Sequence, residues 1–258
     1  MRYYYILVEG PHDEAAIGKV LQILGLRQIR NKEEIPYIWQ GLIPNKYPFI
    51  DGRLEKISPV PDFYKSDDVC VAIKAALGES RIIAELNNTM AIMQREQLKQ
   101  LNGILVICDA DNKSANEKYN EFILTITKRK ELTFDETCFI NKEGYFKDIN
   151  IKCDIYIFPN NKDCGTLEDI LLEGAKIQYN DLLDKALDYI ESVDDKYTSK
   201  LSISKNKKAI IGSMASVLNP GVANQVSIKN DKWINQNNIL QSDKLKILYE
   251  FIKEFIES

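Results

Sequence analysis

Three largely apolar runs of the sequence are each followed closely by acidic residues. The runs cover residues 6–8, 104–108 and 154–158. Carboxylate oxygens are the ligands that Mg²⁺ and Mn²⁺ prefer, so acids gathered in one place would predict a site for these ions. The acids that follow the runs are Glu9, Asp13, Asp109, Asp111, Glu168 and Asp169.

Taken singly, these acids differ in how strongly each one indicates a functional site. Asp109-Ala110-Asp111 alone is weak evidence, because aspartate is common in turns, where its side chain bonds the nearby backbone. Glu9 is stronger evidence, because a glutamate at the end of an apolar strand has low strand propensity and risks burial without a partner. As a group, the carboxylates would raise one another's pKa values by repulsion, and a divalent ion would relieve that repulsion.

The acids can meet if the three runs are parallel strands of one sheet. Residues 3–8 have the continuous hydrophobicity of a strand that is covered on both faces. Pro11 suits the first position of a following helix, and Gly25 suits the position just after its end. Right-handed crossovers bring the carboxyl ends of parallel strands to one edge, where ligands bind in open α/β sheets. The predicted fold is therefore α/β, a parallel sheet flanked by helices.

Predicted strands alternate with helices over residues 1–175, and only helices are predicted over residues 176–258. The sequence therefore predicts a sheet-based core followed by a helical region. Residues 31–66 hold five of the eight prolines and are expected to be mostly an inserted loop. Within them, Tyr37-Ile38-Trp39 is expected to be a short strand. Residues 67–77 are ambiguous between helix and strand.

Further elements are expected from hydrophobic periodicity and turn signals. A hairpin is expected at 137–149, with Glu143-Gly144 at its turn. Strands are expected at 104–108 and 153–158, and Thr166 is expected to cap a short helix. The expected helices cover residues 79–100, 114–129, 180–196, 205–218 and 241–257.

Composition excludes several classes of protein. The sequence has one histidine, and its five cysteines show no Cys-x-x-Cys spacing, so a zinc site or a disulfide framework is not expected. No apolar run approaches the roughly 20 residues that a membrane-spanning helix needs. The first residues enter a strand directly and lack the pattern of a signal peptide. We therefore expect a cytoplasmic protein without a membrane partner.

A local nucleic-acid-binding surface is compatible with the charge of the chain. The net charge of −4 argues against a broad basic surface. Aromatic and basic side chains together can bind single strands by stacking and by charge. The candidates for such a surface are Trp39, Lys200, Lys205, Lys207 and Lys208.

The motifs resemble the Toprim domain, which topoisomerases, bacterial primases and OLD-type nucleases share. The resemblance rests on Val8-Glu9-Gly10 with Asp13, and on the apolar strand that ends in Asp109-Ala110-Asp111. It covers roughly residues 1–175 and implies a Rossmann-like sheet. It also implies that Glu9 is a general acid/base or a metal ligand, and that Asp109 and Asp111 bind Mg²⁺.

Residues 165–170, Gly-Thr-Leu-Glu-Asp-Ile, look most like the small stand-alone and OLD-like Toprim proteins. Similarity to OLD-type nucleases implies that Asp13 and Glu168 or Asp169 complete a two-metal site. Those enzymes also use a downstream lysine, for which Lys207 and Lys208 are the candidates. Considered without the resemblance, these two lysines are better explained as solvated surface charges.

The chain also departs from the larger members of the family. The sequence contains no Walker A motif, so an ATPase partner would be a separate chain. No topoisomerase module with a nucleophilic tyrosine and no zinc-binding primase module is recognised.

The expected function is Mg²⁺- or Mn²⁺-dependent hydrolysis of phosphodiester bonds in DNA or RNA by a two-metal mechanism. The alternative is a non-catalytic Toprim module that binds or regulates a partner, such as a separate ATPase, in defence or repair. A flavodoxin-like or receiver-like domain is a third interpretation, but we cannot place the phosphoacceptor aspartate and lysine of a receiver. The oligomeric state stays open, with a homo-oligomer among the options.

Overall fold

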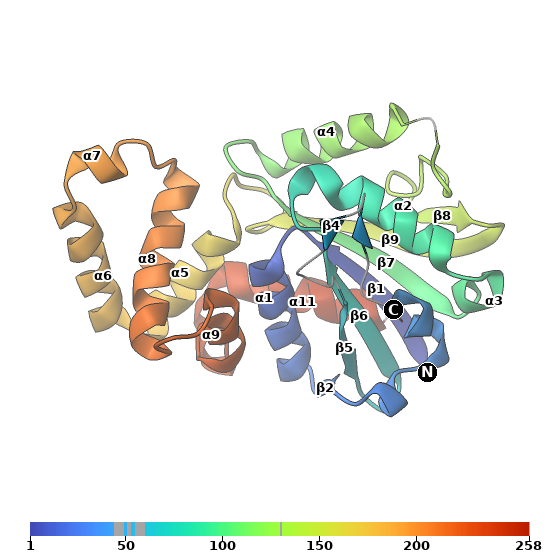
Figure 1. Ribbon diagram of the computed structural model, residues 1–258, viewed down its shortest axis with the longest axis horizontal. Helices are drawn as coiled ribbons and strands as arrows, with labels where there is room; N and C mark the ends of the chain where they lie inside the picture. The colour runs from blue at the N-terminus through green and yellow to red at the C-terminus, as the bar shows by residue number, and fades with distance from the viewer. Residues whose placement is uncertain (44–48, 51–52, 55–59, 130, 258) are drawn as a thin grey trace. The chain divides into compact units, whose positions relative to one another are not determined.

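The computed structural model describes residues 1–43, 49–50, 53–54, 60–129 and 131–257 and contains a seven-stranded mixed sheet (Figure 1). The strand order is β2-β5-β6-β1-β7-β9-β8. The strands are β1 (Arg2–Val8), β2 (Arg27–Ile29), β5 (Asp62–Lys65), β6 (Val69–Ala75), β7 (Leu101–Asp109), β8 (Glu143–Phe146) and β9 (Ile149–Phe158). A separate two-stranded sheet joins β3 (Phe49–Ile50) to β4 (Arg53–Leu54).

The centre of the sheet is parallel, and its edges are antiparallel. β1 runs parallel to both β6 and β7, with Val8 opposite Ala75 on one side and opposite Ile107 on the other. β5 is antiparallel to β2 and β6, and β8 is antiparallel to β9. Residues 4–8 of β1 are completely buried, as their continuous hydrophobicity predicts. The α/β class is thus confirmed.

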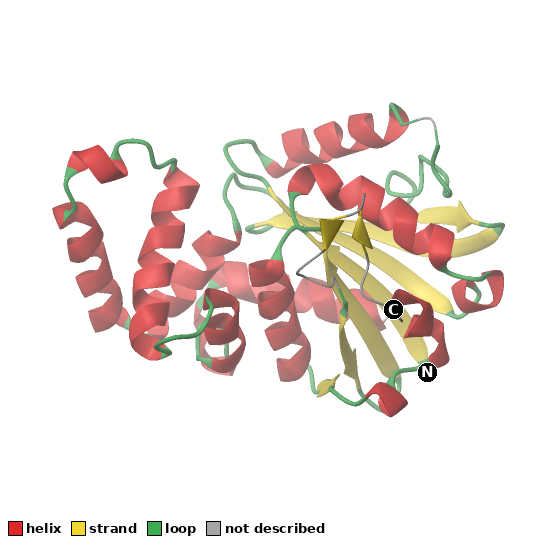
Figure 2. Cartoon of the chain, in the orientation of Figure 1, coloured by secondary structure: helices red, strands yellow, loops and turns green. Residues whose placement is uncertain are grey.

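Helices make up most of the remaining chain (Figure 2). The 3₁₀ helices are η1 (Lys32–Glu34), η2 (Tyr37–Leu42) and η3 (Glu79–Arg81). The α-helices are α1 (Pro11–Ile23), α2 (Ile82–Ile92), α3 (Arg95–Leu98), α4 (Ala115–Thr127), α5 (Leu167–Gln178), α6 (Asn180–Ser192), α7 (Asp195–Thr198), α8 (Ile203–Leu218), α9 (Asn224–Asn230), α10 (Gln236–Gln241) and α11 (Asp243–Glu257). Among the described residues, every helix is too short or too polar to cross a bilayer.

The chain divides into two compact units that alternate along the sequence. Unit 1 holds most of the sheet and comprises Met1–Glu14, Gly25–Ile107 and Tyr119–Tyr156. Unit 2 is mainly helical and comprises Ala15–Leu24, Cys108–Lys118 and Ile157–Ser258. In unit 2, α8 packs against α5, α6 and α9, and α5 also contacts α10 and α11. The boundary predicted between residues 175 and 176 stays a prediction.

The Pro-rich segment differs from its prediction. Tyr37-Ile38-Trp39 is not a strand but part of the 3₁₀ helix η2, in which Ile38, Trp39 and Leu42 are buried. Residues three and four apart share a helix face, and this spacing explains why the segment turns. The expected loop at 31–66 also contains η1 and β5, and residues 44–48, 51–52 and 55–59 of it lie outside the described part of the chain.

Two further elements depart from their predictions. The single helix expected over 79–100 is interrupted because Met93 is extended and Gln94 begins a new helix, where its N–H donates to Gln97 Oε1 at 2.8 Å. The hairpin exists, but Lys147 and Asp148 form its turn, with φ angles of 50° and 65°. Residues 143–144 lie inside β8, where a Cβ on Gly144 would come within 2.0 Å of Cys138 Cβ.

Candidate functional site

Asp109 is tied to the start of α5. It is the last residue of β7, and its side chain is largely buried. Its Oδ1 accepts a hydrogen bond of 2.9 Å from the backbone N–H of Leu167, the first residue of α5. The N-terminus of a helix favours negative charge, so α5 stabilises the ionised carboxylate.

Asp111 is held by a backbone bridge to Gly165. The N–H of each residue donates to the carbonyl oxygen of the other at 2.8 Å. Both have positive φ angles, 55° for Asp111 and 140° for Gly165. A Cβ at position 165 would lie 2.6 Å from Asp169 Oδ2, so the close approach of loop and helix requires glycine there.

Glu168 and Asp169 lie in the first turn of α5. Asp169 Oδ2 accepts from the N–H of Thr166 at 2.9 Å, and its Oδ1 accepts from Lys207 Nζ at 2.6 Å. Glu168 is 3% exposed, and its Oε1 lies 3.7 Å from Lys208 Nζ. Its other oxygen, Oε2, is buried without a hydrogen-bond partner. Leaving a charged oxygen without a hydrogen bond inside a protein is costly, and a nearby cation would offset that cost.

The two lysines reach α5 because of how α8 begins and packs. Ser202 caps α8 by accepting from the N–H of Lys205 at 3.3 Å. Ile210, Ile211 and Met214 are buried on the same helix, and α8 packs on α5. The structure thus brings Lys207 and Lys208 to the acids of α5.

A third lysine, which is not among the candidates predicted from the sequence, lies near Asp111. Lys118 is in the first turn of α4, and its side chain is only 6% exposed. Its Nζ lies 3.7 Å from Asp111 Oδ2. Ala115, Phe122 and Ile126, at helical spacing from it, are also buried. A lysine in an otherwise apolar stripe is the sequence signal that could have identified it.

Glu9 and Asp13 belong to unit 1. Asp13 is largely buried, and its Oδ2 accepts a hydrogen bond of 2.7 Å from the N–H of Gly10, at the start of α1. Glu9 follows the last residue of β1 and is partly exposed. Its backbone carbonyl accepts from the N–H of Gly78 at 3.0 Å. Because β1 and β7 are parallel and in register, they end at the same edge of the sheet, as expected.

The acids of unit 2 have the donor chemistry of a divalent-cation site. Asp109, Asp111 and Glu168 supply only oxygen atoms, which suits Mg²⁺ or Mn²⁺, and Glu168 Oε2 is a buried oxygen that lacks a hydrogen bond. In the part of the chain that the structure describes, no three acidic, histidine or cysteine side chains are grouped closely enough to hold an ion as they lie.

Trp39 does not belong to a binding surface. Its side chain is completely buried, its Nε1–H donates to Cys70 Sγ at 3.4 Å, and its ring lies edge-on to Tyr3 at 6.1 Å between centroids. Burial raises the pKa of the Cys70 thiol to about 11. The prediction that Trp39 stacks on a base is wrong, because 3₁₀ helix η2 turns the indole into the core.

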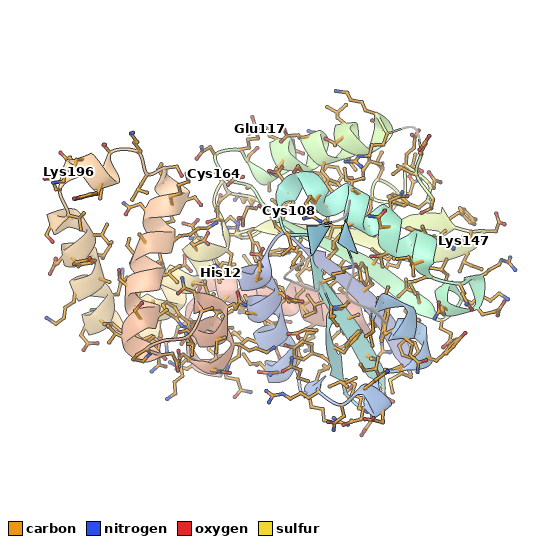
Figure 3. All side chains as sticks on the ribbon, viewed as in Figure 1. His12, Cys108, Glu117, Lys147, Cys164 and Lys196 are labelled. Atoms are coloured by element: carbon orange, nitrogen blue, oxygen red, sulfur yellow. The ribbon has the colours of Figure 1, made fainter. Side chains whose placement is uncertain are left out.

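Lys200 and Lys205, in contrast, are exposed. A further exposed lysine, Lys196, lies on α7 and is labelled in Figure 3. Tyr197 is 68% exposed, and Lys196 Nζ lies 4.8 Å from the centroid of its ring. Unit 2 therefore has an exposed aromatic side chain that is not among the candidates predicted from the sequence.

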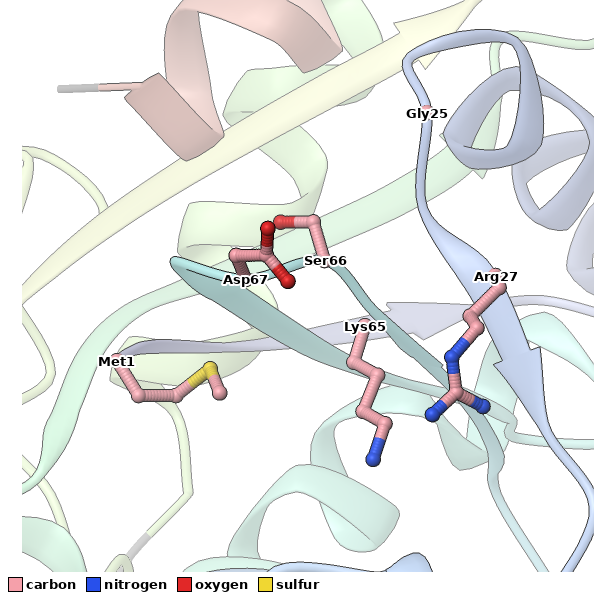
Figure 4. A pocket seen from close by; sticks show the side chains of 6 residues that line it. All are labelled: Met1, Gly25, Arg27, Lys65, Ser66 and Asp67. Carbon is pink, nitrogen blue, oxygen red and sulfur yellow. The ribbon is translucent and has the colours of Figure 1, made fainter.

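A pocket of about 450 Å³ lies in unit 1, and none of the candidate acids lines it (Figure 4). Its basic side chains are already paired, because Glu34 Oε2 lies 2.5 Å from Arg27 and 3.1 Å from Lys65. These hydrogen bonds lower the pKa of Glu34 to about 2. The lining residues are Met1, Gly25, Arg27, Lys65, Ser66 and Asp67.

Comparison with known proteins places the chain in a family. A family model described as a protein of unknown function, DUF3226, matches residues 3–257. The chain belongs to the DUF3226 family. No curated protein matches this DUF3226 sequence.

A solved structure resembles this DUF3226 chain in fold. It is the crystal structure of the hypothetical protein PH0156 from Pyrococcus horikoshii OT3, which is 18% identical with a TM-score of 0.55. The match covers 99% of this chain and 95% of that one. At this identity the likeness concerns the fold alone.

Proposed function

We propose that the chain is a Toprim-like nuclease that hydrolyses phosphodiester bonds of DNA or RNA with Mg²⁺ or Mn²⁺. The observation that carries the proposal is Glu168, a buried carboxylate with an oxygen that lacks a hydrogen bond, at the helix end that also holds Asp109. When bound, a divalent cation would offset the negative charge that develops on the phosphate oxygens.

The residues of unit 2 have distinct roles in this proposal. Asp109, Asp111 and Glu168 would hold the cation. Lys207 positions Asp169, to which its ammonium group is hydrogen-bonded at 2.6 Å. The side chain of Lys208 is 51% exposed, so its ammonium group can turn from Glu168 to a phosphate oxygen of the substrate. In unit 1, the sequence alone proposes Glu9 as a general acid/base or metal ligand and Asp13 as a metal ligand.

The charge distribution of unit 2 supports a nucleic-acid substrate. From Lys196 to Asn230 the sequence contains six lysines and no acidic residue, whereas the whole chain has a net charge of −4. Lys200 and Lys205 are exposed in this basic stretch. Phosphate groups bind such lysines by charge, and Tyr197 offers a ring on which a base can stack.

Cleavage assays with a matched variant test the proposal. Plasmid, single-stranded DNA and single-stranded RNA are incubated with the protein and Mg²⁺ or Mn²⁺. We expect cleavage by the wild type and a loss of roughly 100-fold or more in Asp109→Asn, because the variant lacks a ligand charge. Asp188→Asn, an exposed aspartate on α6, should cleave like the wild type. No cleavage of any substrate, or equal cleavage by Asp109→Asn, would refute the proposal.

A second candidate function is a binding module that serves a partner such as a separate ATPase. The observation that favours it is the set of ion pairs Lys118–Asp111, Lys207–Asp169 and Lys208–Glu168, through which lysines already balance these acids. Purification from the native host together with calorimetric titration of Mn²⁺ separates the two. A stoichiometric partner and no affinity for metal would support the binding module. For either function we infer a cytoplasmic location, in keeping with the free thiols of all five cysteines.

A further inference from the structure

The segment between α6 and α8 exposes a group of apolar side chains. Residues 196–205, which we call the connecting segment, hold most of α7 and the first residues of α8. α6 packs against α8, and α7 joins them at one end of the pair (Figure 1). Tyr197, Leu201 and Ile203 are 68%, 37% and 70% exposed. Single exposed apolar residues are common, whereas several close together with polar neighbours are typical of a binding surface.

The connecting segment is positively charged. It contains three exposed lysines, Lys196, Lys200 and Lys205, and no acidic residue. Asp194 directly precedes the segment, and its Oδ2 lies 3.5 Å from Lys196 Nζ. Both side chains of this pair are largely exposed, so the pair is weak and leaves Lys196 able to meet another anion. The partner that complements this surface is therefore anionic and also offers apolar or planar groups.

Hydrogen bonds hold the backbone of the connecting segment at both ends. At the start of α7, Asp194 Oδ1 accepts from the N–H of Lys196 at 2.9 Å. At the start of α8, Ser202 Oγ accepts from the N–H of Lys205 at 3.3 Å. The exposed side chains thus project from an ordered backbone, which lowers the entropy that a partner must offset on binding.

Tyr197 presents an aromatic ring for stacking. Lys196 Nζ lies 4.8 Å from the centroid of the ring, within the range of a cation–π contact that helps to fix its orientation. The residue nevertheless keeps 68% of its surface exposed, so a planar group can lie against the ring. The lysine beside it can meet a negative charge at the same time.

We propose that the connecting segment binds an unpaired nucleic-acid strand, so that the substrate class of this chain is single-stranded DNA or RNA. A single strand offers phosphates to the lysines, and unstacked bases to Tyr197, Leu201 and Ile203. A duplex offers the same phosphates but keeps the faces of its bases inside the stack, so the apolar side chains would gain little from it. A wide anionic membrane surface would meet the overall charge of −4, whereas a strand contacts the segment locally.

The inference rests on the proposed function and names the substrate class that function leaves open. It depends on the connecting segment alone and requires no metal ion. Binding and cleavage can therefore be measured separately.

Binding in the presence of EDTA tests the inference, because a metal-dependent nuclease does not cleave its probe there. The full chain is titrated by fluorescence anisotropy against three labelled probes of equal length. They are oligo-dT, a duplex, and an abasic strand that has the phosphates of oligo-dT without its bases. We expect oligo-dT to bind roughly tenfold or more tightly than either other probe, because only its bases can stack.

Variants of Tyr197 identify the surface. Tyr197→Ala should weaken binding of oligo-dT roughly fivefold or more and leave the salt dependence unchanged, since it removes a ring and no charge. Tyr197→Phe keeps the ring and should bind like the wild type. Tyr145→Ala is the matched control, because Tyr145 is 60% exposed on β8 of unit 1.

The outcomes separate this inference from the proposed function. Equal affinity for oligo-dT and the abasic strand, or an unchanged affinity in Tyr197→Ala, would overturn the inference and leave a nuclease of duplexes intact. Binding to phosphatidylserine vesicles in place of oligo-dT would also overturn it. Binding of oligo-dT that depends on Tyr197, without cleavage once Mg²⁺ or Mn²⁺ is added, would support the surface and refute the nuclease.

Discussion

At the scale of single residues, Gly165 connects the two acidic segments of unit 2. Its backbone bridge to Asp111 places the Asp-x-Asp loop against α5, and its lack of a side chain leaves room for Asp169. The φ angle of 140° is one that other residues rarely adopt. Both the geometry of the backbone and the nearby carboxylate therefore require glycine at this position.

Replacing Gly165 should lower stability and weaken metal binding together. We expect Gly165→Ala to lower the free energy of unfolding by about 1–3 kcal/mol, because the backbone is strained and the new Cβ meets Asp169. Urea denaturation measures this loss, and Mn²⁺ titration measures the binding. Gly221→Ala is the matched control, since Gly221 also has a positive φ, 83°, but a Cβ there would meet nothing within 4 Å. A loss in Gly165→Ala no larger than the control's would show that the Asp169 contact is unimportant.

At the scale of elements, the position of α5 depends on close packing along its length. A Cβ on Gly174 of α5 would come within 2.0 Å of the carbonyl oxygen of Trp233. Asn238 Nδ2 donates to the carbonyl oxygens of both residues, at 3.3 Å to Gly174 and 2.9 Å to Trp233. This contact fixes the helix whose first turn carries Glu168.

Enlarging Gly174 should displace α5. We expect Gly174→Ala to cost about 2–3 kcal/mol of unfolding free energy, since the clash is with rigid backbone. Gly212→Ala on α8 is the opposite case, because the atom nearest to a Cβ at this position would be Asn224 Nδ2, at 3.4 Å. There alanine should be neutral or stabilise by about 0.5–1 kcal/mol through its higher helix propensity. Thermal denaturation of the two variants measures both effects, and an unchanged melting temperature in Gly174→Ala would contradict the packing.

Glu34 of η1 forms ion pairs with Arg27 of β2 and Lys65 of β5, and we expect these pairs to weaken at low pH. Hydrogen bonds from Arg27, Lys65 and Asn31 lower the pKa of Glu34 from 4.5 to about 2. A lowered pKa in the folded state means that the stabilisation is fully present above about 4.5 and is lost as the pH falls through 2. The denaturation midpoint of the wild type should therefore fall between pH 5 and pH 2 more steeply than that of Glu34→Gln. Glu33→Gln removes a charge from the same turn and is the control; parallel pH curves for wild type and Glu34→Gln would contradict the assignment.

At the scale of the whole molecule, charge is distributed unevenly. The stretch from Lys196 to Asn230 has six lysines and no acid in a chain of net charge −4. Binding of nucleic acid to this stretch would therefore be local, against an overall repulsion, and would depend strongly on salt.

Removing lysines from the basic stretch should weaken binding and its salt dependence. We expect Lys200→Ala combined with Lys205→Ala to lower affinity for labelled single-stranded DNA, and to reduce the slope of log K against log salt by about 0.7 for each phosphate that the protein no longer neutralises. Fluorescence anisotropy over a series of salt concentrations measures both. Lys185→Ala combined with Lys246→Ala removes two exposed lysines outside the stretch and should change neither. Equal effects of the two double variants would refute a local surface.

The structure could be predicted from the sequence where a local pattern of residues determines it. Continuous hydrophobicity predicted the buried strand β1, and Thr166 before an apolar helix predicted the cap of α5. It failed where tertiary contacts decide. The indole of Trp39 is buried because of packing against Tyr3 and Cys70, which lie far away in the sequence. The partners of Lys207 and Lys208 are likewise set by the packing of α8 on α5.

The interleaving of the two units has a consequence for dissection and for evolution. The chain passes from one unit to the other after residues 14, 24, 107, 118 and 156, so each unit is assembled from three separate segments. Limited proteolysis or gene truncation at any one place therefore cannot release either unit whole. For the same reason, recombination could not exchange one unit between relatives as a single contiguous segment.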